Sequence, residues 1–317
     1  MAHQDVLERI LQADDPSEFR ELQSHLPEEW IHDALRTTNR GSVRQRRLPA
    51  FMTAWVVIAM GLFRDRAIDE VVAHLGLANR SKSCGRTDSP PVGSGVIAEA
   101  RRRLGEEPMK VLFYRTVNER SARGDSGETW RGLVPFGLDG IVFRIADEKA
   151  NDAEFGRPGS NRGVSAYPQA RVLLLTELRT HLFCDAAIGP CRGKRTGELS
   201  LARDVWGRLP SRSIVLLDGG LVDYGVLFRL HHGDNADTAQ QRHWLVPAKK
   251  SATWNRVKRL GHGDSIVDLR IGSKPRKEDP KLPPTMQVRA IVHQVRGFRP
   301  KTLLTSLLDA AAYLGSE

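Results

Sequence analysis

Two aspartates of this 317-residue sequence stand in apolar stretches where a carboxylate could do chemistry. Asp139 lies within the apolar run Phe136–Phe143, and Asp218 follows Ile214–Leu217 and precedes two glycines. An aspartate in or at the end of a buried strand is costly unless it is paired or binds a cation. If the two strands are neighbours, both carboxylates reach one place and can hold Mg²⁺, which prefers hard oxygen ligands. Two ions about 3.5–4 Å apart are the usual arrangement for attack on a phosphodiester. The alternative is that each aspartate only caps a turn.

The charge balance favours an anionic partner. The formal net charge is +10, and Arg supplies 37 of the 48 cationic side chains. A guanidinium group binds two phosphate oxygens at once, although a GC-rich genome would also enrich arginine. Neither a G-x-x-x-x-G-K-[ST] loop nor a G-x-G-x-x-G loop occurs, so a nucleotide-driven enzyme is not indicated. A composition of 40% hydrophobic and 27% charged residues excludes disordered, collagen-like and coiled-coil classes.

No segment predicts a membrane location or secretion. The most apolar stretch, residues 48–63, is shorter than the roughly 20 residues that a membrane span requires, and it predicts a buried core helix. The first 20 residues are acidic and polar, unlike a secretory leader. We therefore expect a cytoplasmic protein, associated with the bacterial nucleoid if it binds DNA.

The elements that must position the two aspartates lie in the second part of the chain. Helical spacing of apolar residues in 5–37, 66–75 and 96–104 predicts a helical N-terminal domain over residues 1–125. From residue 132 the pattern changes to strands at 133–143, 170–178, 181–188 and 214–217, with helices at 197–206 and 224–232. This order predicts an α/β fold built on a mixed sheet.

The motifs, taken in chain order, resemble the DDE transposases of the insertion-sequence-four superfamily. The similar segments are Arg47–Arg66, Ile97–Gly105, Leu138-Asp139-Gly140, Tyr167–Arg171, Gly197-Glu198 and Leu217-Asp218-Gly219-Gly220. The resemblance implies an RNase H-like catalytic core over 132–235, a strand-rich insertion over 236–300 and the start of a return to the core over 301–317. It also implies that Asp139 and Asp218 are the first two acids of a catalytic triad. Such an enzyme uses Mg²⁺ or Mn²⁺ to cleave and join strands of double-stranded DNA, at transposon ends and target, as a homodimer.

Basic clusters and one aromatic residue are candidates for contact with that DNA. They are, in chain order, Arg101, Arg102, Arg103, Trp244, Lys249, Lys250, Arg256 and Lys258. The basic residues would contact phosphates, and a solvated protein face is their alternative role. The aromatic ring lies in the insertion where relatives contact DNA near the cleaved end. It would stack on an extruded base, and core packing is its alternative role.

The chain departs from the family pattern at its third acid. The family places a glutamate on a helix after a Thr-Ser-Leu-Leu-Asp segment, which is Thr305–Asp309 here and is followed by only eight residues. Of the late acids, Glu278 and Asp279 lie in a basic, proline-flanked stretch, and Glu317 is the last residue. We therefore expect no third acid, a C-terminally truncated copy and impaired catalysis. The alternatives are a non-catalytic DNA-binding product that interferes with full-length transposase and an RNase H-like nuclease unrelated to transposition.

Smaller departures flank the second aspartate. Gly219 stands where the family has arginine, and Leu221 stands where it has phenylalanine. Both changes fall in the turn that must orient the carboxylate of Asp218.

Overall fold

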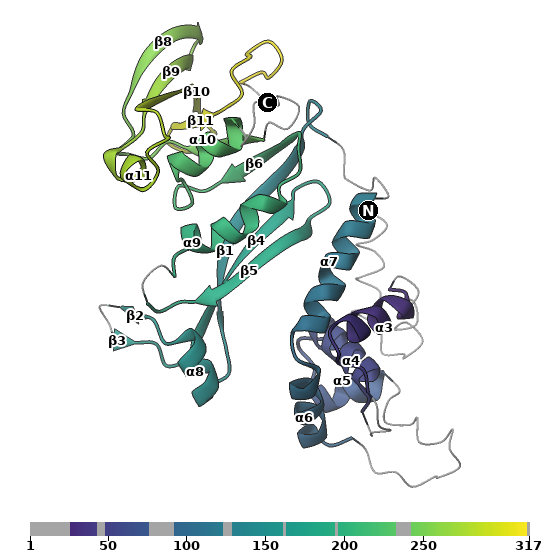
Figure 1. Ribbon diagram of the computed structural model, residues 1–317. Coiled ribbons are helices and arrows are strands. Elements are labelled where there is room, and N and C mark those ends of the chain that lie inside the picture. The colour runs from purple at the N-terminus through teal and green to yellow at the C-terminus, as the bar shows by residue number, and fades with distance from the viewer. Residues whose placement is uncertain are drawn as a thin grey trace. The chain divides into compact units, whose positions relative to one another are not determined.

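The chain folds into two compact units, Met1–Ala122 and Arg123–Glu317 (Figure 1). The computed structural model describes residues 26–42, 48–75, 92–122, 129–160, 163–193, 196–232 and 242–315. The helices predicted at 5–13 and over most of 16–26 lie outside these residues.

The first unit is helical, as predicted. Its described helices are α3 (Glu28–Thr37), α4 (Ala50–Leu62), α5 (Ile68–His74), α6 (Ser94–Leu104) and α7 (Glu107–Ala122). Helix α4 is the apolar stretch of the sequence, and Trp55 and Ala59 on it are almost completely buried. Ile31 of α3 and Leu104 of α6 pack into the same core cluster, so α4 is the central helix of this core. None of the described helices is both long enough and apolar enough to cross a membrane.

The second unit is built on one large sheet. Its strands run in the order β5-β4-β1-β6-β7-β11-β10-β9-β8, and a separate pair is formed by β2 (Gly159–Ser160) and β3 (Gly163–Val164). The strands of the large sheet are β1 (Val134–Arg144), β4 (Gln169–Glu177), β5 (Leu182–Pro190), β6 (Ser213–Leu217), β7 (His243–Pro247), β8 (Trp254–Gly261), β9 (Asp264–Arg270), β10 (Thr285–His293) and β11 (Lys301–Thr305). The helices of this unit are α8 (Lys149–Phe155), α9 (Glu198–Val205), α10 (Tyr224–His232) and α11 (Ser273–Glu278).

Five consecutive strands of the large sheet form the RNase H-like arrangement that the resemblance implies, in the order β5-β4-β1-β6-β7. β1, β4 and β5 make an antiparallel meander. β6 then pairs in parallel with β1 on its other side, and β7 pairs in parallel with β6. The mixed α/β fold class is therefore confirmed.

The strand-rich stretch after β7 extends this sheet. β11 pairs antiparallel with β7, and β10, β9 and β8 follow in antiparallel order. β7 itself falls within the range predicted as an insertion, although it pairs directly with core strand β6. The basic stretch around Pro275 forms the short helix α11, and its proline lies in the first turn, where a helix tolerates it.

The main core of this unit lies on the sheet face that α9 covers (Figure 1). Leu138 on β1 and Leu173 on β4 are buried there together with Ala202 and Val205 of α9. Side chains alternate between faces along a strand, so Asp139 must point to the opposite face.

Candidate active site

Asp139 and Asp218 lie on neighbouring strands at the same level. β1 and β6 are parallel, and Leu138 is paired with Leu217 in their register. Each aspartate is the next residue after that pair, Asp139 within β1 and Asp218 directly after β6 ends. Neighbouring strands are about 4.8 Å apart, so the two main chains pass each other at short range at this point. The structure thus brings together the two residues selected from the sequence.

Both carboxylates are exposed, which corrects the expectation that they sit in buried strands. The Gly140 N–H donates to Asp139 Oδ1 at 2.8 Å. The N–H groups of Gly220 and Leu221 donate to Asp218 Oδ1 at 2.8 and 3.0 Å. In the described part of the chain, neither Oδ2 atom accepts a hydrogen bond and neither carboxylate is in an ion pair. Each aspartate therefore has one oxygen oriented by the main chain and one that remains available.

Glu198, at the start of α9, packs directly on the strand that carries Asp139. A Cβ atom added at Gly140 would lie 2.6–2.7 Å from Oε1, Cδ and Cγ of Glu198, so only glycine leaves room for this side chain. Glu198 Oε1 also accepts from Arg171 Nη1 of β4 at 3.4 Å. Gly197-Glu198 and Arg171 belong to the segments that carry the family resemblance, which assigns them no role. A glycine inside a strand is the signal for such a close approach.

The turn after Asp218 is fixed from two sides. Leu221, which replaces the phenylalanine of the family pattern, is 1% exposed and belongs to the main core of the unit. Lys249 Nζ donates to the main-chain oxygen of Val222 at 2.8 Å. The leucine thus anchors the turn in the core, and Lys249 is occupied in holding the same turn.

The sheet face around Asp139 is apolar and open. Ile141 lies two residues after Asp139 on β1, and Leu216 is paired with Gly137 two residues before it, so all these positions share one face. Ile141 is 46% exposed and Leu216 is 37% exposed. Ile188 of β5, on the same face through its pairing with Val172, is 64% exposed. Helix α9 covers only the other face.

No group of three His, Cys, Asp or Glu side chains that could hold a metal ion occurs among the described residues. Glu278 is the last residue of α11. Asp279 forms an ion pair with Arg229, whose Nη1 lies 2.6 Å from its carboxylate. Glu317 lies outside the described residues.

The basic candidates for DNA contact are mostly exposed. Arg256 and Lys258 lie on β8, the edge strand of the sheet, and Lys250 is exposed in the turn before it. Arg101 and Arg102 are exposed on α6, and Arg103 is half-buried. Charged side chains on an edge strand also discourage pairing with another chain, so exposure fits both roles.

Trp244 is a core residue, which corrects its candidacy as a base-stacking residue. Its side chain is 1% exposed, and its indole Nε1 donates to the main-chain oxygen of Leu227 at 3.0 Å. The aromatic ring packs from β7 against α10 and offers no face to a base. The alternative role of core packing is therefore the one observed.

Three histidines meet where α10 packs on β7. The ring centroids of His231 and His232 are 4.8 Å apart, and those of His231 and His243 are 5.9 Å apart. His243 Nδ1 is 3.1 Å from Ser306 Oγ. Burial first, and then the charges of the other two imidazoles, lower the pKa of His231 to about 4.

Comparison with known proteins identifies the family. Residues 16–114 match the model of the insertion element 4 transposase N-terminal domain. The chain is 30% identical over 284 residues to the putative transposase InsZ of Escherichia coli K12, covering 89% of this chain and 87% of that protein. The chain belongs to the IS4 transposase family. It is also 29% identical over 301 residues to the transposase InsG for insertion sequence element IS4 of the same organism, across 93% of this chain.

The match to InsG covers only part of that protein. The chain spans 63% of the length of InsG. Among solved structures, the piggyBac transposase synaptic complex with hairpin DNA is similar over 89% of this chain and 51% of that chain, at 9% identity and a TM-score of 0.35. A likeness of that size supports no inference, so the IS4 family assignment rests on the sequence comparisons.

Proposed function

We propose that this IS4-family chain acts in metal-dependent phosphoryl transfer on double-stranded DNA, cleaving and joining strands at the ends of a bacterial insertion element. The observation that carries the proposal is the pairing of β1 with β6, in which Asp139 and Asp218 follow directly after the paired residues Leu138 and Leu217. Two carboxylates at the same level on neighbouring strands are what a shared cation requires. Association with the bacterial nucleoid, and action as a homodimer on DNA, belong to the same proposal.

Asp139 and Asp218 have the properties of ligands for Mg²⁺, or for Mn²⁺. Both are exposed, and no described cation neutralises either carboxylate. The main-chain N–H groups of Gly140, Gly220 and Leu221 hold one oxygen of each carboxylate in position. When bound, a divalent ion lowers the pKa of a water ligand and stabilises the charge that develops on a phosphodiester.

We further propose that the polypeptide of residues 1–317 catalyses poorly by itself. Two carboxylates leave a divalent ion dependent on water and phosphate for its remaining ligands. The exposed apolar side chains of Ile141, Leu216 and Ile188 beside the aspartates favour a site that needs a further segment to cover it and exclude water.

Metal binding tests the site independently of catalysis. Mn²⁺ binding followed by electron paramagnetic resonance should show weak binding to the intact chain, and Asp139→Asn and Asp218→Asn should each abolish it. These variants keep the shape of the side chain and remove its charge. Asp204→Asn, at an exposed position of α9, is the matched control and should bind as the parent does. Equal Mn²⁺ binding by all four proteins would refute the assignment of the ligands.

Cleavage separates the enzyme from the alternative function, a DNA-binding product that interferes with complete transposase. We expect DNA binding without strand cleavage in Mg²⁺ or Mn²⁺ on the ends of the element. Cleavage that requires Mg²⁺ and is lost in Asp139→Ala would show that two carboxylates suffice. Inhibition of a full-length relative by this chain, without cleavage of its own, would favour the alternative function.

A further inference from the structure

Lys249 lies just after β7, beside the turn that follows Asp218. Strands β6 and β7 pair in parallel, so both end at the same edge of the sheet. Asp218 is the first residue after β6, and Lys249 is the second residue after β7. The two segments lie close together at this edge, because a Cβ atom added at Gly219 would be 3.8 Å from Pro247 Cγ.

The side chain of Lys249 binds the turn directly. Its Nζ donates to the main-chain oxygen of Val222 at 2.8 Å, and Val222 is itself 3% exposed. Burial raises the pKa of Tyr224, and a hydrogen bond from the main chain of Lys249 acts on it in the opposite direction. In the described part of the chain, Lys249 forms no ion pair with a carboxylate. The partner of its ammonium group is therefore a main-chain carbonyl of the turn.

The main chain around Lys249 is held by the sheet. The N–H of Ala248 donates to the main-chain oxygen of Thr302 on β11 at 2.8 Å. The N–H of Ala252 donates to the main-chain oxygen of Lys249 at 2.9 Å. The lysine thus extends from a fixed position, and the turn cannot move away from β7 without breaking the bond to Val222.

The bond acts on the segment that orients the Asp218 carboxylate. The N–H groups of Gly220 and Leu221 donate to Asp218 Oδ1, and Val222 is the next residue of the same turn. Asp139 differs, because it lies within β1 and is paired with a residue of β4. Asp218 stands beyond the end of its strand, so its orientation depends on the turn.

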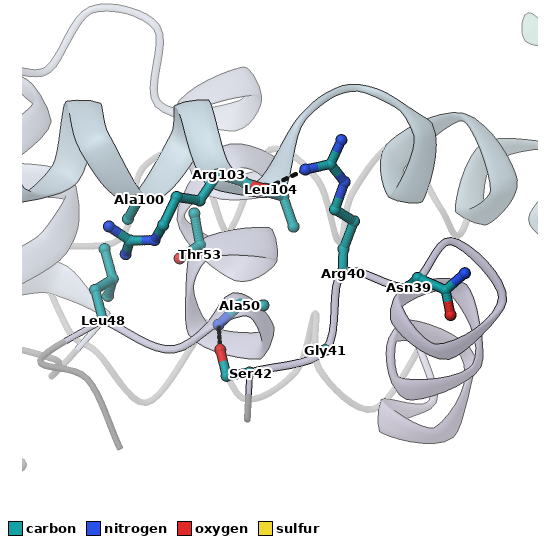
Figure 2. A pocket seen from close by; sticks show the side chains of 10 residues that line it. All are labelled: Asn39, Arg40, Gly41, Ser42, Leu48, Ala50, Thr53, Ala100, Arg103 and Leu104. Carbon is teal, nitrogen blue, oxygen red and sulfur yellow. Dashed lines mark hydrogen bonds between the residues drawn. The ribbon is translucent and has the colours of Figure 1, made fainter. Parts of the chain in front are cut away.

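The helical unit uses a cationic side chain in the same way. Arg40, in the loop after α3, donates from Nη1 to the main-chain oxygen of Arg103 at 3.2 Å, as Figure 2 shows. This contact joins two segments of the other compact unit. Arg40 therefore provides a control for the general effect of losing a bond between a cation and a main-chain carbonyl.

We propose that Lys249 is a positioning residue for Asp218, which holds the turn against the end of β7 and keeps the carboxylate directed towards a divalent cation. With only two carboxylates at the site, a bound ion depends strongly on the orientation of each. Groups that orient metal ligands typically contribute about 10–100-fold to metal affinity. The role replaces the phosphate contact predicted for Lys249 from the sequence. The inference rests on the proposed metal-dependent function and deepens it.

Mn²⁺ binding to the whole 317-residue chain, followed by electron paramagnetic resonance, tests this role by the sign of the effect. If Lys249 acted only through its charge, its removal would strengthen binding of a divalent cation. Loss of positioning weakens binding, and we expect Lys249→Met to bind Mn²⁺ about 10-fold more weakly than the parent. Lys249→Arg keeps the charge and the donor and should restore most of the affinity. Lys250→Met, at the exposed neighbouring lysine, and Arg40→Met are the controls and should not weaken binding.

Hydrogen exchange followed by mass spectrometry reports on the turn without any metal. In Lys249→Met, a peptide containing Gly220 and Leu221 should exchange faster than in the parent. A peptide containing Gly140, whose N–H donates to Asp139, should keep the parental rate. Thermal melting shows which variants are folded. Lys249→Gln, with a shorter polar side chain, takes the place of Lys249→Met if the latter does not fold.

DNA binding separates positioning from contact with a phosphate. Fluorescence anisotropy of a labelled duplex between about 50 and 200 mM salt should give the parental salt slope for Lys249→Met. A logarithmic slope lower by about 0.9, together with unchanged Mn²⁺ binding, would overturn the positioning role and return Lys249 to the phosphate contacts.

The remaining outcomes distinguish this inference from the proposed function. Mn²⁺ binding that is lost in Asp218→Asn but unchanged or tighter in Lys249→Met would overturn the role of the lysine and leave the two-aspartate site in place. Weakening of the same size in Arg40→Met would also overturn it, because a general loss of stability would then explain the result. Absence of Mn²⁺ binding by the parent, or equal binding by Asp218→Asn, would overturn both.

Discussion

Replacing Gly140 by alanine tests the packing that supports Asp139. The added Cβ would lie 2.6 Å from Glu198 Oε1 and 2.7 Å from its Cδ and Cγ, so the glutamate must move by about 1 Å to reach ordinary contact. The Glu198 side chain would then leave its rotamer, at about 0.5–1.5 kcal/mol. It would also lose its partly buried contact with Arg171, worth about 0.5–1 kcal/mol. We expect Gly140→Ala to destabilise the sheet unit by about 1–2 kcal/mol, which lowers its melting temperature by about 2–8 °C.

A double-mutant cycle isolates the cause. Glu198→Ala removes the side chain that collides, so Gly140→Ala in that background should be neutral or slightly stabilising, as is usual where alanine fits. Thermal and urea denaturation of the parent, the two single variants and the double variant, followed by circular dichroism, give the four stabilities. The same loss from Gly140→Ala with and without Glu198 would refute the proposed contact, because the cost would then belong to the backbone alone.

Three further predictions concern stability. Asp264→Ala should cost about 3–5 kcal/mol in urea denaturation, because it leaves the 1%-exposed Arg289 without the carboxylate that pairs with it, whereas Asp268→Ala on the same strand should cost little. Trp244→Phe should cost about 1–3 kcal/mol, because it removes the indole hydrogen bond to the Leu227 main-chain oxygen and leaves space beside a smaller ring in the core. DNA affinity, measured by fluorescence anisotropy, should be unchanged, and a selective loss of affinity would favour the stacking role. The unfolded chain protonates His231 near pH 6.5, but the folded chain does so only at about pH 4, so stability should fall as the pH drops from 6.5 towards 4. His231→Gln should weaken that dependence in urea titrations between pH 7 and 5, and an unchanged slope would contradict burial of the neutral imidazole.

Local patterns predicted the helices and strands of this chain better than they predicted which strands are neighbours and which strand faces are buried. The apolar run of α4 and the strands β1 and β6 were predictable because apolar residues at a regular spacing define them. The neighbouring positions of β1 and β6 depend on pairing between residues 79 positions apart, such as Leu138 and Leu217, which local spacing does not determine. Asp139 was expected to be buried because it lies in an apolar run. Ile141 and Phe143, which follow it on the same face of β1, are however exposed themselves.

Among the site residues, sequence motifs identified the two aspartates but not the contacts around them. Asp139 and Asp218 were selected by motif, whereas the contact of Glu198 with Gly140 needed coordinates. A strand glycine signals that something approaches closely, but not which side chain does so. Trp244 illustrates the reverse case, in which a residue type suited to DNA binding is used to fill the core.

The return of β11 to β7 bears on how this sheet can change in length during evolution. Leu303 is paired with Pro247, so the excursion through β8, β9 and β10 begins and ends on strands that are already antiparallel neighbours. Antiparallel neighbours need only a tight turn between them. Strands can therefore be added or deleted between Pro247 and Leu303 without rerouting the chain through the rest of the sheet. The pairing of β1 with β6, which aligns the two aspartates, lies on the other side of β7 and is unaffected by such a change.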